Sequence, residues 1–119
     1  MSKLRITNSK GRVLADRADV ADTVAKRNTG LLKHLRLDPG EGLLIPTQAV
    51  HTFRMKFPID IAFLSRKRKV LKIRANMDRG RIAISLRAHS VLELPAGTLA
   101  QTETVAGDQL EFQKYDSDS

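Results

Sequence analysis

The stretch from His51 to Leu64 most constrains the fold, because it joins a two-residue alternation, a proline and a continuous apolar run. In its first half, every second side chain is large and mostly apolar, which predicts a strand that buries the face formed by His51, Phe53, Met55 and Phe57. Pro58 lacks a backbone donor and marks a strand edge or break. The run from Ile59 to Leu64 barely alternates, which indicates a second strand covered on both faces.

Short apolar segments separated by turn residues predict further strands. Residues 3–8 and 13–15 flank a turn and read as a hairpin. Additional strands are expected at residues 43–45, 70–73, 91–94 and 109–114, with a weaker one within 81–88. From Asp19 the apolar spacing becomes helical, with Asp19 or Asp22 as the N-cap, until Gly30 interrupts it. This order predicts a mainly β fold with one or two short helices, arranged as an antiparallel β sandwich or barrel.

The chain of 119 residues has the size of one domain, so we expect a single domain over residues 1–119 with a frayed acidic tail at 115–119. The N-terminal residues have no apolar core of signal-peptide length, and no window of about 18 apolar residues exists. We therefore expect a cytoplasmic protein without a transmembrane segment.

The chain lacks the residues that several classes of chemistry require. The chain has no Cys, which excludes a thiolate metal site and a thiol nucleophile. His34, His51 and His89 do not have the spacing of metal ligands, and no phosphate-binding glycine loop or Gly-x-Ser-x-Gly elbow occurs. We expect no metal and no cofactor, and the balance is against an enzyme.

Three separated motifs, at residues 45–64, Val91–Gly97 and Gly107–Leu110, resemble the bacterial and archaeal family called domain of unknown function 192. The resemblance runs from about Gly30 to Phe112. The family has no settled biochemical role. The resemblance implies one or two helical turns within 98–105, and it matches Glu93 to a recurring Glu and His51, Thr52, Phe53 and Met55 to a recurring pattern.

Polar residues among the predicted strands are the candidate site. Asp60 interrupts an apolar run, so its carboxylate needs donors or a cation. It either binds a ligand or acts as an acid or base, or it accepts backbone N–H groups or pairs with an Arg to fix the kink at Pro58, which is the commoner role. His51 is either a hydrogen-bonded core or rim histidine, which is the commoner role, or a ligand-binding or proton-transfer group oriented by Asp60 or Asp108. The candidate ligand-binding residues are His51, Thr52, Arg54, Met55, Asp60, Glu93 and Asp108.

The charge of the chain suggests an alternative. Lys and Arg total 21 against 13 Asp and Glu, a net charge of +8. Four consecutive cations, Arg66, Lys67, Arg68 and Lys69, fall in the predicted turn after Leu64 and would contact phosphates without sequence preference. A solvated loop is the commoner role of such a run, and the few aromatic residues lie mostly in strands expected to be buried, which leaves no stacking platform.

These observations favour a small cytoplasmic β-rich binding module with a cleft for a small molecule or a protein partner. The first alternative is a non-specific nucleic-acid binder acting through residues 66–69. The second is a small hydrolase or isomerase using a His51 and Asp60 pair, which requires the two side chains to lie within hydrogen-bond reach of each other or of a shared water.

Overall fold

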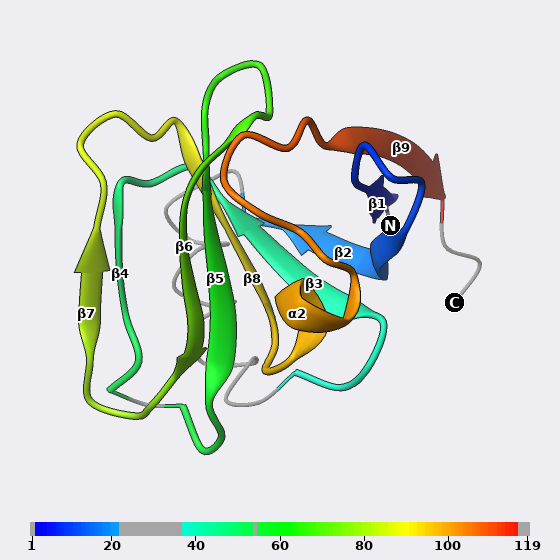
Figure 1. Ribbon diagram of the computed structural model, residues 1–119. Helices are drawn as coiled ribbons and strands as arrows, with labels where there is room; N and C mark the ends of the chain where they lie inside the picture. Colours follow the sequence, from blue (N-terminus) through cyan, green and yellow to red (C-terminus); the bar gives the residue numbers. More distant parts are fainter. Residues whose placement is uncertain (1, 22–36, 54, 117–119) are drawn as a thin grey trace.

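The computed structural model describes residues 2–21, 37–53 and 55–116. Within these residues the fold is mainly β with one short helix, which confirms the predicted class. The elements are β1 Ser2–Thr7, β2 Val13–Val20, β3 Glu41–Ile45, β4 Ala49–His51, β5 Ile59–Leu64, β6 Val70–Met77, β7 Ile82–Ile84, β8 Ser90–Pro95, α2 Thr98–Gln101 and β9 Glu111–Asp116 (Figure 1). No helix in the described ranges is long and apolar enough to span a membrane.

Seven strands form one curved sheet in the order β6-β5-β8-β3-β2-β1-β9, and β4 pairs with β7 in a separate two-stranded sheet. Neighbouring strands run antiparallel except β2 and β3, which are parallel. The sheet is therefore mixed rather than purely antiparallel, and it is not closed into a barrel. A parallel pair needs a connection of a dozen or more residues, and residues 21–40 are long enough to provide it.

Both faces of the large sheet are covered. On the first face, the short helix α2 contributes Leu99 to a core formed by Leu4, Ile6, Leu14, Ala15, Ala18, Ala62, Leu64, Val70, Leu92, Leu94, Leu99 and Leu110. On the second face, β4 and β7 contribute Val50 and Ala83 to a core formed by Leu37, Val50, Met55, Ile59, Ile61, Phe63, Met77, Ala83, Ala88 and Val91. All six residues of β5 are buried, as its continuous apolar pattern predicts.

The predicted strand through the first half of the His51–Leu64 stretch is wrong beyond His51. Phe53 and Phe57 are 49% and 52% exposed, whereas Thr52 and Met55 are buried. The cause is Thr52, whose backbone N–H donates to the Arg81 carbonyl at 2.9 Å and whose carbonyl accepts the Met55 N–H at 3.2 Å. These bonds turn the chain after β4, so the alternation in the sequence does not correspond to two sides of a strand.

The predicted helical start at Asp19 is also wrong. Asp19 and Val20 are the last residues of β2 and pair with Leu43 and Leu44 of β3. Pairing with a strand distant in sequence therefore outweighs the local helical spacing. The rest of that segment, including Asp22 and Gly30, lies outside the described residues. The opening hairpin (β1 and β2) and the helical turn after Gly97 (α2) are confirmed.

Candidate functional site

Glu93 lies in the middle of the large sheet. Its Cα partners are Ile61 of β5 and Leu43 of β3. Residues directly opposite each other in antiparallel strands point to the same face, so the Glu93 side chain is flanked by two buried aliphatic ones. Alternation along β8 places Leu92 and Leu94 on the opposite face, in the first core. Glu93 points away from them, yet it is only 2% exposed.

The surroundings of Glu93 disfavour its charge. Burial raises the pKa of the Glu93 carboxyl to about 7, from an ordinary value of 4.5. Within the described part of the chain, no group donates a hydrogen bond to this carboxyl, and desolvation is the one cause of its pKa shift. Near neutral pH, the group therefore exists in comparable amounts as a neutral acid and as a carboxylate.

Met55 and Thr52, both predicted site residues, lie toward the face of the sheet that Glu93 shares. Met55 is 4% exposed and packs in the second core with Ile61 and Val91, which flank Glu93 on β5 and β8. The Thr52 hydroxyl donates to the Asp78 carbonyl and accepts the Arg81 N–H at 2.9 Å. Thr52 thus stabilises the loop that contains Met55, and its hydroxyl forms its hydrogen bonds with backbone groups.

Asp60 lies on the opposite face of the sheet from Glu93. Its Cα partner is Leu94, and it is fully buried. One carboxylate oxygen accepts the Asn76 N–H at 2.7 Å, and the other accepts the Leu99 N–H at 2.9 Å. This geometry matches the structural role expected for Asp60, because both oxygens bind backbone donors of β6 and α2.

His51 is exposed at the end of β4, where its ring stacks on Phe53 with a centroid distance of 4.9 Å. Both His51 and Asp60 are described residues, and they form no hydrogen bond with each other. Asp60 is completely buried, while His51 faces solvent. The direct pair that the hydrolase or isomerase alternative would use is therefore not formed.

The two remaining predicted ligand residues lie apart from Glu93 or outside the described ranges. Asp108 precedes β9 and forms an ion pair with Lys10 of the opening hairpin at 3.2 Å. The Asp108 carboxyl accepts a hydrogen bond from the Val105 backbone N–H, and this bond is the largest cause that lowers its pKa. The Lys10 ammonium lowers the pKa further. Arg54 lies outside the described residues. Ligand binding by His51, Arg54 and Asp108 stays a prediction.

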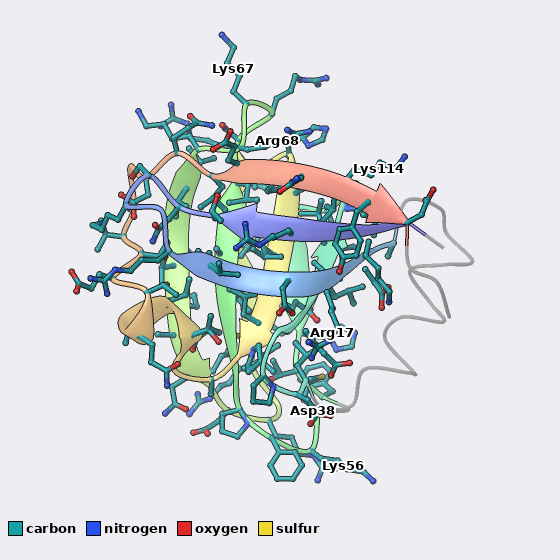
Figure 2. The ribbon with its side chains drawn as sticks, turned by 90° about the vertical axis from the view of Figure 1, so that its right-hand side faces the viewer. Arg17, Asp38, Lys56, Lys67, Arg68 and Lys114 are labelled. Carbon is teal, nitrogen blue, oxygen red and sulfur yellow. The ribbon has the colours of Figure 1, made fainter. Side chains whose placement is uncertain are left out.

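The basic turn after β5 is exposed over all four of its cations, residues 66–69, and Lys67 extends from its tip (Figure 2). Arg68 adopts a left-handed conformation, with φ of 68°, and its guanidinium lies over the Phe112 ring at 4.4 Å. One of the four cations is therefore engaged within the chain. Nucleic-acid binding by this turn stays a prediction.

Sequence reasoning missed Asn8, which is 4% exposed. Its amide donates to the Thr102 carbonyl at 2.8 Å and to the Thr104 hydroxyl at 3.0 Å, and its side-chain oxygen accepts the N–H groups of Lys10 and Arg12. The sequence feature that indicates this role is an Asn directly before the Ser-Lys-Gly turn, because Asn side chains in turns form hydrogen bonds with the backbone two residues ahead. Asn8 joins the opening hairpin to the end of α2.

Sequence comparisons cover most of the chain. A family model described as "Uncharacterized ACR" matches residues 5–112. A UPF0127 protein of Thermococcus sibiricus is 25% identical over 113 residues, which cover 91% of this chain and 73% of that protein.

Two solved structures are similar over most of their length. One, from Sinorhizobium meliloti 1021, is described as a "putative transcription regulator"; it has a TM-score of 0.80 at 23% identity and 94% coverage of both chains, and this likeness shows the fold alone. The other is a protein of unknown function from Novosphingobium aromaticivorans, with a TM-score of 0.75 at 26% identity, covering 91% of this chain and 82% of that one.

Proposed function

The chain belongs to the family called domain of unknown function 192, and we propose that it is a binding module for a small ligand, with the Glu93 carboxyl as the polar anchor of its site. One observation carries the proposal. Glu93 is 2% exposed at the centre of the sheet, and no described group donates a hydrogen bond to its carboxyl.

The energetic argument concerns what a carboxyl at this position costs. Moving a carboxyl group from water into apolar surroundings without a hydrogen bond costs several kcal/mol, and more when it is ionised. A Leu or Met between Leu43 and Ile61 would fill the same space without that cost. Buried polar groups are normally hydrogen-bonded, so a ligand that donates to the Glu93 carboxyl would explain why an acid is retained here.

The groups around Glu93 indicate which chemical class of ligand the site would bind. An ionised carboxylate accepts hydrogen bonds from an ammonium or guanidinium group, and the protonated acid donates one hydrogen bond and accepts others. The aliphatic neighbours Leu43 and Ile61 favour an apolar body beside that polar group. Met55 is a flexible side chain in the adjacent core and adapts to ligands of different shape. We therefore infer a ligand with one amine or hydroxyl on an apolar frame.

The experiment is a thermal-shift screen of the full chain against primary amines, guanidines and alcohols with apolar bodies, at pH 6 and pH 8. A ligand at about 100 times its Kd adds about 2.7 kcal/mol, which raises Tm by several degrees for a domain of this size. Glu93→Gln keeps the shape of the side chain and removes its charge. Glu111→Gln, at an exposed position of β9, is the matched control.

The proposal predicts that an amine shifts the wild type and Glu111→Gln equally, and that this shift is lost in Glu93→Gln. The shift should be larger at pH 8, where more of the carboxyl is ionised. Equal shifts in Glu93→Gln and the wild type would contradict the assignment of Glu93 as the anchor.

A further inference from the structure

The outward side of the two-stranded sheet β4–β7 is apolar. Val50 and Ala83 point inward and are buried in the second core, so their neighbours along each strand point outward. On β7 these are Ile82 and Ile84, which are 63% and 51% exposed. Leu86, two residues further along, is 75% exposed. Three large aliphatic side chains thus follow one another on the surface.

Residues of β4 and its flanks extend this row. His51 and Ala49 are the Cα partners of Ile82 and Ile84, and the His51 ring stacks on Phe53, which is 49% exposed. We call this surface the outer apolar face; it consists of Ala49, His51, Phe53, Ile82, Ile84 and Leu86. A contiguous row of large apolar residues differs from the singly exposed ones found on most proteins and is typical of a docking surface.

Cations border the outer apolar face. The Lys72 ammonium donates to the Ile84 carbonyl at 3.0 Å, and the Arg79 guanidinium donates to the Phe53 carbonyl at 3.4 Å. Arg81 and Arg87 are exposed and directly adjoin Ile82 and Leu86 in sequence. Each end of the apolar row is therefore next to positive charge.

The charge of the whole chain is concentrated in the same segment. Residues 47–90 contain eleven Lys and Arg but only two acidic residues, Asp60 and Asp78. Asp60 is buried on the face of the sheet that packs against the first core. The remainder of the chain is close to neutral, since the total is +8. Figure 1 shows β4 and β7 on the side of the molecule opposite β1 and β9. Four of the eleven cations lie in the turn 66–69, which bridges to Gln109 before β9, and Lys72 and Arg79 border the outer apolar face.

We propose that the outer apolar face docks on the surface of an anionic lipid bilayer. At such a surface Ile, Leu and Phe side chains enter the boundary between headgroups and acyl chains, while Arg and Lys reach the lipid phosphates. Phe53, Ile82, Ile84 and Leu86 each have a cation bonded to their backbone or adjacent in sequence, as this arrangement requires. The inference is independent of the proposed function, because Glu93 is 2% exposed within β8 and is not part of this face.

Other occupants fit less well. A second copy docked symmetrically through this face would place its cations against the same cations, which is unfavourable. A nucleic acid would engage the cations but give no favourable partner to the aliphatic side chains. An acidic protein would need carboxylates over a long distance, because cations extend from Lys56 at one end of the molecule to Lys67 at the other (Figure 2). A bilayer presents negative charge over that whole span.

The test is co-sedimentation of the full chain with vesicles of phosphatidylcholine alone and with vesicles of equal parts phosphatidylcholine and phosphatidylglycerol. Binding should require phosphatidylglycerol and weaken as salt rises. The combined change Ile82→Ser, Ile84→Ser and Leu86→Ser should lower the partition coefficient by about tenfold or more. Each of Arg79→Gln, Arg81→Gln and Arg87→Gln should lower it about fivefold.

Control variants and competitors make the outcomes decisive. Val105→Ser removes an apolar residue that is 54% exposed outside this face and should bind as the wild type does. Thermal unfolding checks that each variant is folded, and Leu86→Gln alone replaces the triple variant if that one is not. Sedimentation independent of phosphatidylglycerol, or unchanged in the serine variant, would overturn the proposal. Binding to polyglutamate or duplex DNA in place of vesicles would overturn it in favour of an acidic protein or a nucleic acid.

Discussion

The Asp60 carboxylate accepts the Leu99 backbone N–H at 2.9 Å and so joins the central strand β5 to the helix α2, which lies 39 residues further along the chain. Its second oxygen accepts the Asn76 N–H at 2.7 Å. Asn76 has a positive φ of 52°, and the pairing of β5 with β6 changes register between Ile59 and Ile61. One buried carboxylate therefore satisfies donors that an irregular strand and a short helix leave without partners.

Replacing Asp60 with Asn should destabilise the fold by about 2 to 4 kcal/mol, because the amide nitrogen would face a backbone donor and leave one N–H unpaired. Urea unfolding at neutral pH measures the change. Asp78→Asn, at an exposed position, should change stability by less than about 0.5 kcal/mol. A loss at Asp60 no larger than that of the control would show that its two bonds contribute little.

Asn8 offers a test in which shape is kept and donors are removed. In Asn8→Asp, an oxygen would replace the amide that donates to the Thr102 carbonyl at 2.8 Å, so two acceptors would face each other in a buried site. We expect a loss of about 2 to 3 kcal/mol, because the Thr104 hydroxyl could donate to the new carboxylate only by giving up its bond to the Thr102 hydroxyl. Chemical unfolding should show the loss, whereas Gln113→Glu on the exposed part of β9 should not. Equal stabilities would mean that the Asn8 amide bonds are replaceable.

Gly42 tests how closely the strands pack. A Cβ at this position would lie 3.3 Å from the Glu93 carbonyl oxygen and 3.3 Å from the Ala15 Cβ. Backbone of β8 cannot move away as a flexible side chain can, so Gly42→Val should destabilise the protein by about 2 to 3 kcal/mol. Ala75→Val at an exposed position of β6 is the control and should be neutral or slightly stabilising, as a β-branched residue in a strand. A neutral Gly42→Val would show that β2, β3 and β8 separate easily.

The local pattern of apolar and turn residues was enough to predict those elements whose residues are covered or joined as that pattern indicates. The continuous apolar run of β5 indicated a strand covered on both faces, and the hairpin of β1 and β2 followed from its turn residues. The segment after His51 misled the prediction, because Thr52 bonds to residues 78–81 and turns the chain. Such bonds join positions that are far apart in sequence, so alternation alone cannot reveal them.

The candidate site was only partly predictable for a related reason. Alternation along β8 showed that Glu93 points away from Leu92 and Leu94. The pattern of a single strand does not tell whether its other face meets solvent or a second core. Glu93 is buried because the second face is also covered, and β4 and β7 contribute Val50 and Ala83 to that cover. The same contact turns Ile82 and Ile84 outward, although their pattern alone would suit a strand packed on a core.

The pH dependence of stability tests the state of Glu93 directly. Below pH 4.5 the carboxyl is protonated in both the folded and the unfolded chain, so it contributes no difference. Between pH 4.5 and about 7 the unfolded chain loses this proton while the folded chain retains it, so folding becomes less favourable as pH rises. The slope is about 1.4 kcal/mol per pH unit, and the loss is complete, at about 3 kcal/mol, above pH 7.

Glu93→Gln cannot ionise and should escape this loss. Its stability relative to the wild type should therefore increase from acid toward pH 8 by about 3 kcal/mol in the absence of ligand, whereas Glu111→Gln should show no such trend. Urea unfolding at several pH values measures both. A constant difference between Glu93→Gln and the wild type from pH 4 to pH 8 would mean that the folded chain stabilises the Glu93 charge as well as water does. The site would then have no need of a ligand's amine, so this measurement also bears on the proposed function.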